Sequence, residues 1–171
     1  MVPDIALRLQ SMTRAMTEVV IPGIDPSQKL ALEQAHLVVA YLALLSDQHD
    51  KTYQYEMAEL RDARGLLERL VACTRGDARA SAALAESQSA AALSIPSQAR
   101  LADLVRAVKG AADALVHAAY EQGKPDVLAN VASIVMDHAQ RQIARERVWA
   151  RKAGFEVEPE KLPGLDEVIA G

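Results

Sequence analysis

The segment from Asp25 to Arg75 constrains the fold of this chain more than any other. It opens with Asp25-Pro26-Ser27-Gln28, contains no further proline, and is interrupted by one glycine, Gly65. At its centre, nine apolar residues follow one another, Leu37–Leu45. Such a run leaves a helix no polar side for water, and it is too short to span a bilayer. We therefore expect this run to be covered on all sides.

The opening residues predict where this long helix begins. Asp25 can accept hydrogen bonds from free backbone amides, and Pro26 suits the first helical position. Gln28 stands where a capping box places its Glu or Gln. The sequence thus predicts a helix that starts at Pro26.

A shorter amphipathic helix precedes the long segment. Its apolar residues recur at spacings of four and three, and they are Ile5, Leu9, Met12, Met16 and Val19. Pro22-Gly23 is expected to end this helix. Because the turn before Asp25 is short, we expect an antiparallel pair in which the first helix covers the long segment to about residue 43.

Seven polar residues, Ser46 to Thr52, interrupt the long segment just beyond that cover. A second apolar stripe then follows at helical spacing: Tyr53, Met57, Leu60, Leu67 and Val71. We favour one continuous helix, roughly 75 Å long, because the polar stretch lacks Gly and Pro. The alternative is two helices joined by a turn at 46–52. A continuous helix would require an elongated molecule or a dimer.

The second half of the chain has a different composition. Residues 76–96 are rich in Ala and Ser and predict a linker with some helix. Residues 97–154 predict a second antiparallel helical hairpin, capped by Ser97 and turning at Gly123 and Pro125. Residues 155–171 predict an irregular tail, in which Leu165 to Ala170 can form one helical turn.

Composition favours an all-α class. Half of the residues are apolar, 4% are aromatic, and Ala and Leu carry most of the apolar content. We expect one domain, residues 1–171, with four to five helices arranged as two antiparallel hairpins. The net charge of -4 argues against nucleic acid or an anionic membrane as the main partner. The single Cys73 excludes an internal disulfide, and the first residues lack a signal-peptide pattern, so we expect a cytoplasmic protein.

Glu33-x-x-His36 is the strongest metal motif in the sequence. Di-metal bundles use such a pair on each of two helices, and a second pair is absent here. The nearest substitutes are Asp113, His117 and Glu121 on one helix and Asp137-His138 on the next. In the expected hairpin, His117 and His138 lie roughly 12 Å apart along the axis. We therefore expect no metal, no cofactor and no catalytic residues.

His49 is the most interesting single residue of the polar stretch, because Asp47 and Asp50 flank it. One interpretation is a polar layer that sets the register of a partner helix, and the other is a solvated segment. We expect a homodimer whose interface combines His49 with Tyr53, Met57, Leu60, Leu67 and Val71. Cys73 has no motif of a catalytic thiol, and we interpret it as a half-buried structural residue.

Five cations gather near the end of the last long helix: Arg141, Arg145, Arg147, Arg151 and Lys152. They could bind an acidic partner or the acidic tail of the chain itself, which carries Glu156, Glu158 and Glu160. Stacking aromatic residues are nearly missing, so nucleic acid is a poor candidate. No phosphate-binding loop or nucleophile elbow occurs in the sequence.

Two runs carry a resemblance to other proteins. The first is Leu30-Ala31-Leu32-Glu33-Gln34-Ala35-His36-Leu37-Val38-Val39, and the second contains Tyr53-x-Tyr55-Glu56-x-x-Glu59-Leu60-Arg61-Asp62. Over residues 5–75 the chain resembles uncharacterised bacterial helical proteins encoded beside phosphotransferase-like kinases and acyl-CoA dehydrogenases. The resemblance implies no assigned activity. It implies an accessory role beside such metabolic enzymes.

The leading hypothesis from the sequence is a non-catalytic helical interaction module that forms a homodimer. The alternative is a helical bundle that binds a small molecule or a metal through carboxylates and has enzyme activity.

Overall fold

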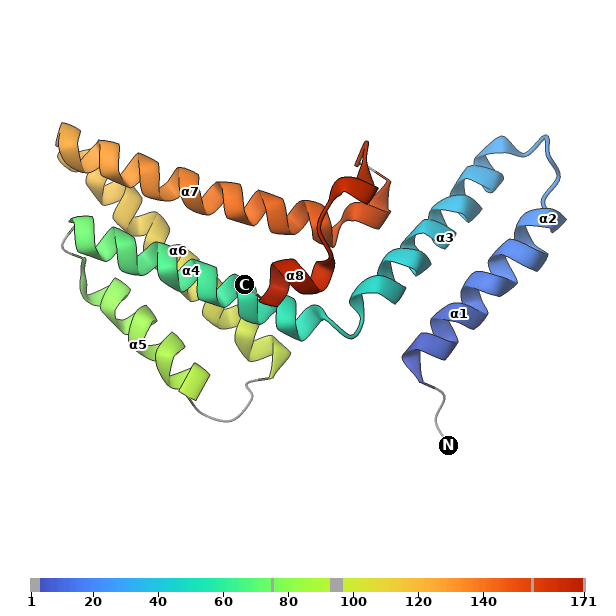
Figure 1. Ribbon diagram of the computed structural model, residues 1–171, viewed down its shortest axis with the longest axis horizontal. Helices are drawn as coiled ribbons and strands as arrows, with labels where there is room; N and C mark the ends of the chain where they lie inside the picture. The colour runs from blue at the N-terminus through green and yellow to red at the C-terminus, as the bar shows by residue number, and fades with distance from the viewer. Residues whose placement is uncertain (1–3, 75, 93–96, 155, 171) are drawn as a thin grey trace. The chain divides into compact units, whose positions relative to one another are not determined.

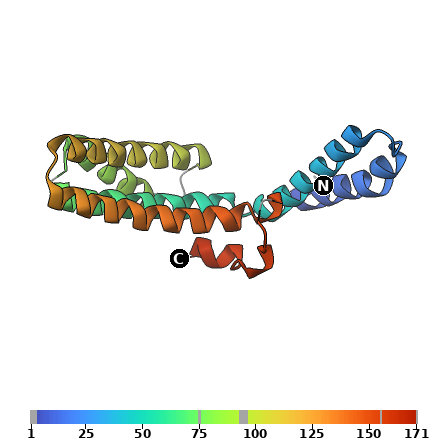
Figure 2. The same ribbon diagram turned by 90° about the horizontal axis from the view of Figure 1, so that it is seen from above.

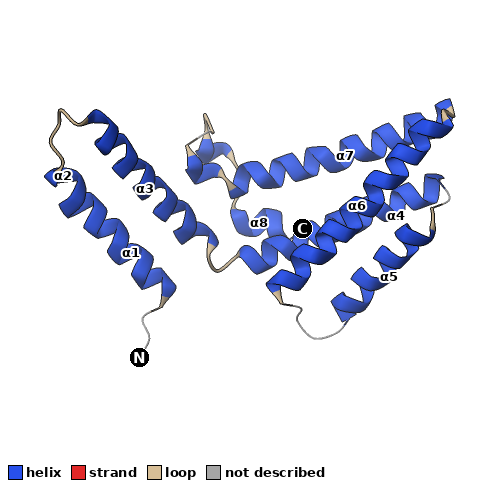
Figure 3. Cartoon of the chain, turned by 180° about the vertical axis from the view of Figure 1, so that it is seen from behind, coloured by secondary structure: helices blue, strands red, loops and turns tan. Residues whose placement is uncertain are grey.

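A computed structural model describes residues 4–74, 76–92, 97–154 and 156–170. Its elements are helices, and the described residues contain no strand (Figure 3). The predicted all-α class is therefore confirmed. Backbone contacts divide the chain into two compact units, and each is described by itself. Unit 1 comprises Met1–Thr52 with Glu146–Val168, and unit 2 comprises Tyr53–Arg145 with Ile169–Gly171.

Unit 1 contains an antiparallel helix pair. Its first arm consists of α1 (Ile5–Ala15), a π-helical segment (Met16–Val20) and α2 (Ile21–Gly23), and its second arm is α3 (Lys29–Gln48). The two arms lie side by side (Figure 1). The first arm ends at Gly23, as the Pro-Gly signal predicts, and Ile24 has an extended backbone.

The long helix starts three residues later than predicted. Pro26 and Ser27 form a turn, and α3 begins at Lys29. The side chain of Asp25 accepts a hydrogen bond from the Ser27 amide at 2.8 Å, and its carbonyl accepts one from the Gln28 amide at 2.9 Å. Asp25 therefore stabilises a local turn and leaves the helix N-terminus uncapped, because Asp side chains favour such turns.

The prediction of one continuous helix from Asp25 to Arg75 is wrong. The chain leaves α3 after Gln48, turns at residues 49–51, and enters α4 (Thr52–Thr74). In the turn, the Lys51 amide and the Thr52 hydroxyl both donate hydrogen bonds to the Gln48 carbonyl, at 2.9 and 3.1 Å. Short polar side chains of this kind compete with helical hydrogen bonds. The turn alternative is the correct one.

Unit 2 is built from α4, α5 (Ala78–Ala92), α6 (Gln98–Gln122) and most of α7 (Pro125–Trp149). Its core is a single cluster to which all four helices contribute, and its fully buried large residues include Leu67, Leu70, Leu101, Leu104, Val108 and Val131. In Figure 2, α6 and α7 run antiparallel from their shared turn. This turn contains Gly123, whose backbone is left-handed (φ 65°), as its position after α6 predicts.

Helix α5 corrects the prediction of an Ala/Ser linker at 76–96. The Asp77 side chain caps it by accepting a hydrogen bond from the Ala80 amide at 2.7 Å. Its buried positions are the small residues Ala80, Ala83 and Ser87, which pack close to α6. Residues 93–96 lie outside the described part of the chain.

The C-terminal tail is more ordered than predicted. It contains 3-10 turns at Arg151–Ala153 and Pro159–Lys161, and α8 (Leu165–Ala170) forms where one helical turn is predicted. Because α3 and α4 are separate helices and α5 and α8 are added, the predicted four to five helices in two hairpins are not confirmed.

Candidate functional site

Unit 2 contains a half-buried cluster of charged side chains between α4 and α7. Arg145, which is 6% exposed, donates a hydrogen bond from Nη1 to Oδ2 of Asp62. Nε of Arg141 lies 3.9 Å from the other carboxylate oxygen. The Arg145 guanidinium also lies over the Tyr55 ring, 5.7 Å from its centroid. A carboxylate that contacts two guanidiniums of another helix forms an ionic link between α4 and α7.

His138 lies on α7 close to this cluster and is 7% exposed. Burial lowers its pKa, the charge of Asp62 opposes this shift, and the charges of Lys109, Arg141 and Arg145 lower the pKa further. His138 is therefore neutral near pH 7, and within the described structure its buried Nδ1 has no hydrogen-bond partner. His138 was considered in the sequence only as a substitute for a missing metal pair, and the structure places it near the cations Lys109, Arg141 and Arg145.

Two more ion pairs link α4 to the other long helices of unit 2. Lys109 of α6 contacts Glu59 of α4 at 2.5 Å, and Arg69 of α4 contacts Asp137 of α7 at 2.8 Å. In each pair, the two residues belong to helices that are not consecutive in the sequence. The pairs therefore help to determine which helices lie next to each other and in what register.

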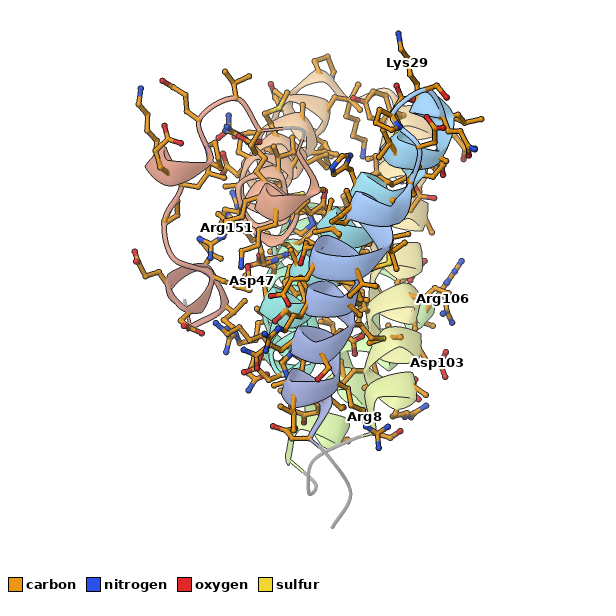
Figure 4. The ribbon with its side chains drawn as sticks, turned by 90° about the vertical axis from the view of Figure 1, so that its right-hand side faces the viewer. Arg8, Lys29, Asp47, Asp103, Arg106 and Arg151 are labelled. Atoms are coloured by element: carbon orange, nitrogen blue, oxygen red, sulfur yellow. The ribbon has the colours of Figure 1, made fainter. Side chains whose placement is uncertain are left out.

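Unit 1 has its own charged cluster, centred on Asp47 at the end of α3. Lys152 contacts the Asp47 carboxylate at 2.8 Å and Arg151 contacts it at 3.5 Å; Figure 4 labels Asp47 and Arg151. Burial raises the pKa of Asp47, but the hydrogen bond from Lys152 and the charges of Lys152, Arg151 and Lys51 outweigh burial and lower it. The cluster therefore fixes the turn after α7 onto α3.

The predicted cationic group is thus largely engaged within the chain. Arg147 forms a two-pronged pair with Glu156 of the tail, with both contacts at 2.8 Å. This is one of the two partners expected from the sequence, the acidic tail. The remaining cations contact Asp62 or Asp47. Neither carboxylate was predicted from the sequence to pair with them.

The residues weighed as metal-ligand candidates in the sequence lie on the surface. Glu33 and His36 are exposed on α3. Asp113 and His117 form an exposed pair on α6, 3.6 Å apart. Within the described ranges, no group of three His, Cys, Asp or Glu side chains could hold a metal ion.

Cys73 is half-buried near the end of α4, and its thiol donates a hydrogen bond to the Leu70 carbonyl at 3.3 Å. It borders a pocket of about 590 Å³ at the end of unit 2, with Thr74, Asp77, Gln122 and Lys124 among its polar lining. The thiol is therefore turned toward its own helix.

The stripe expected to form the dimer interface lies in the core of unit 2. Leu60 and Leu67 are 2% and 0% exposed, and Tyr53, Met57 and Val71 pack against the same cluster. Residues of α6 and α7 share this cluster, so these helices cover the stripe within one chain. His49 lies in the turn between α3 and α4, with Nδ1 3.2 Å from the Ser46 carbonyl oxygen. A second copy would have to displace α6 and α7 to reach the two leucines.

A different apolar surface is open on α3. Its buried residues, Ala35 and Leu42, form the side next to α1. Five other large apolar side chains remain 45–70% exposed: Leu30, Leu37, Val38, Tyr41 and Leu45. With 3.6 residues per turn, they fall within an arc of about 100°. We refer to these five residues as the α3 outer face.

The sequence indicates an apolar surface here, because the run from Leu37 to Leu45 has no polar side. The chain itself leaves most of the run uncovered, because 11% of the apolar window of α3 is buried. By length and composition alone, α3 is also the one helix in the described chain that could cross a membrane. Buried helices of soluble proteins share that property.

No family model matches this chain, and comparisons with curated proteins and with solved structures find no match either.

Proposed function

We propose that this protein is a non-catalytic helical assembly module that forms a homodimer through the α3 outer face. The observation that carries the proposal is the exposure of these apolar side chains, from 45% for Val38 to 70% for Leu30. Contiguous apolar surfaces of this kind on soluble proteins usually mark interaction sites. A helix that is apolar on nearly all sides is stable in water only when other helices cover it.

A second copy of the chain fits this surface. In an antiparallel pair of α3 helices with a twofold axis near Leu37, Leu30 lies level with Leu45 of the second copy. Leu37 then lies level with Val38 of the second copy, and Gln34 lies level with its Tyr41. Apolar side chains face apolar side chains, and the Gln34 amide can pair with the Tyr41 phenol. Two such helix pairs would form a four-helix bundle.

A lipid bilayer fits this surface less well. The uninterrupted apolar run spans about 14 Å of helix, less than half of the hydrocarbon core. Glu33 lies between the exposed leucines, and Lys29 and Asp47 lie near the helix ends. Insertion of the helix pair would also bury Arg8 and Arg14 of α1, at a high energetic cost. A protein partner that covers only the α3 outer face leaves these charges in water.

The accessory part of the proposal is that the assembled module acts beside a metabolic enzyme. It is supported only by the resemblance of residues 5–75 to helical proteins encoded beside phosphotransferase-like kinases and acyl-CoA dehydrogenases. The absence of a triad of metal-binding side chains in the described chain, and the pairing of Asp62 with arginines, support a structural role over chemistry at these sites.

The test compares Leu37→Asp with His36→Asp by sedimentation equilibrium. Both substitutions introduce a carboxylate on α3, but His36 lies outside the outer face. We expect the wild type and His36→Asp to associate at micromolar concentration and Leu37→Asp to lose at least tenfold in association constant. Circular dichroism of each variant checks that the helices remain.

Two results would contradict the proposal. The first is a wild-type protein that sediments as a single 18.5 kDa species at high micromolar concentration. The second is equal weakening by both substitutions. Flotation of the wild type with lipid vesicles, lost in Leu37→Asp, would instead assign the surface to a membrane.

A further inference from the structure

Unit 2 has a second apolar surface, which lies on α7 beside α6. A groove of about 360 Å³ runs between these helices, and it is lined by apolar side chains alone. Val116 and Tyr120 contribute from α6, and Tyr120 is 58% exposed. From α7, Met136 is 60% exposed in the groove, and Ile143, one of the exposed apolar residues beyond it, is 56% exposed. The packing of unit 2 leaves this groove uncovered.

Apolar residues of α7 that are exposed or half-buried follow one side of the helix. We refer to them as the α7 stripe: Leu128, Ala132, Val135, Met136, Ala139 and Ile143. Given 3.6 residues per turn, they fall within an arc of about 100°. The buried residues Val131, Ile134, His138 and Arg145 lie on another side, which faces the core. Leu128, at one end of the stripe, packs against the core cluster, whereas Val135, Met136 and Ile143 are exposed.

No charged residue falls within the stripe, and its neighbours Ser133 and Gln140 are neutral. The charged residues of α7 over this length are engaged inside unit 2: Asp137 contacts Arg69, and Arg141 and Arg145 contact Asp62. A surface without charges offers nothing to a charged partner, whereas the same stripe of a second copy is equally apolar. This property favours an identical partner over one selected by charge.

We propose that the α7 stripe is a contact between two copies of the chain, antiparallel about a twofold axis between Val135 and Met136. In this register, Leu128 meets Ile143 of the second copy, and Ala132 meets its Ala139. Val135 and Met136 meet each other across the axis. The helix repeat produces the symmetric spacing, but the size of the residues is also matched, because alanine faces alanine and large residues face large ones.

The two alanine pairs let the helices approach to about 8 Å, the close end of the usual range. Tyr120 lines the groove from α6 and is exposed, so its ring can contact the second copy. The stripe is about 24 Å long, so it makes a smaller interface than a standard dimer contact. The α7 contact adds to that of the α3 outer face, and the two together drive association beyond the dimer.

Disulfide crosslinking tests the register of this contact independently of α3. The background carries Cys73→Ser to remove the native thiol and Leu37→Asp to disable the α3 outer face. Ala132→Cys and Ala139→Cys are prepared as separate full-length proteins, one bearing an affinity tag. After oxidation, we expect the mixture to yield a mixed disulfide dimer at least tenfold more abundant than the self-dimer of either protein. Addition of Met136→Asp to both proteins should abolish the mixed dimer.

Three results would overturn the proposal. Efficient crosslinking of Ala132→Cys with itself would indicate a parallel contact. The matched control beside the stripe is a mixture of Ser133→Cys with Gln140→Cys. If the Ala132→Cys and Ala139→Cys mixture gave no more dimer than this control, the crosslinks would arise from random collision. A mixed dimer that persists with Met136→Asp would place the contact elsewhere. Because α3 is disabled throughout, these outcomes are separate from failure of the α3 outer face.

Discussion

Arg145 of α7 donates a hydrogen bond to the Asp62 carboxylate of α4, and 83 residues of sequence separate the two. The guanidinium is almost wholly buried, whereas a quarter of the carboxylate remains exposed. Removing the charge of one partner leaves the other in a medium that solvates it poorly. The pair therefore influences how α4 and α7 pack against each other, in addition to its own contribution to stability.

Asp62→Ala should destabilise unit 2 by about 3–5 kcal/mol, because it leaves Arg145 buried without its carboxylate. Chemical denaturation followed by circular dichroism measures the effect. The control is Asp103→Ala, since Asp103 and its partner Arg106 are both exposed and such pairs contribute about 1 kcal/mol or less. Figure 4 labels both control residues. Equal losses in the two variants would mean that the Asp62 pair behaves as a surface pair.

His138 predicts a pH dependence of stability. Burial lowers its pKa in the folded protein, so the unfolded chain binds this proton at a higher pH than the folded chain does. Stability is complete above the ordinary histidine pKa of 6.5 and decreases as pH falls below it. We expect the free energy of unfolding to drop between about pH 6.5 and the lower folded pKa, and His138→Gln to remove that part of the drop.

His117→Gln is the control for this measurement, because His117 is exposed and should leave the slope unchanged. The carboxylates titrate at lower pH: the pKa of Asp47 lies below its ordinary 3.8, and its contribution is lost only as pH falls through that lower value. An acid-side slope equal in the wild type and His138→Gln would show that this side chain is solvated.

Substitution of Leu67 tests whether the stripe that was predicted as a dimer interface belongs to the core of unit 2. It is 0% exposed in the core of unit 2, so Leu67→Ala should lower stability by about 2–5 kcal/mol. The oligomeric state of the variant should stay that of the wild type, measured by light scattering after size exclusion. Leu7→Ala, at a site 54% exposed, should change stability by about 0.5 kcal/mol or less. Dissociation without destabilisation in Leu67→Ala would restore the original interface.

The helix class and several helix ends could be predicted because they depend on local chemistry. Ser97 caps α6 by accepting a hydrogen bond from the Arg100 amide at 3.3 Å, and Gly123 ends α6 in a left-handed conformation. The break after Gln48 could not be predicted in this way. A polar stretch without Gly or Pro suits an exposed helix and a turn equally, and tertiary contacts decide between them.

The remaining errors also concern contacts between distant segments. Helix α5 was underestimated because it buries small residues such as Ala80 and Ser87, which give a weak apolar pattern. The stripe around Leu67 was assigned to a partner because nothing local shows that α6 and α7 cover it. The pairing of Asp62 with Arg145 joins parts of the chain whose proximity depends on the bundle. The apolar run of α3 indicated that a surface there needs cover, but not that the chain would leave one side of it open.

The cap of α5 gives a local test of the corrected linker. Asp77 accepts a hydrogen bond from the Ala80 amide at 2.7 Å, and loss of an N-terminal cap costs about 0.5–2 kcal/mol. Asp77→Ala should therefore speed hydrogen exchange of the α5 amides, whereas Asp77→Asn, which retains an oxygen acceptor, should leave exchange near the wild-type rate. Exchange in α6 serves as the internal reference, because its cap is Ser97. Amides of residues 80–89 that exchange as fast as an unstructured peptide in the wild type would mean that the segment is a linker after all.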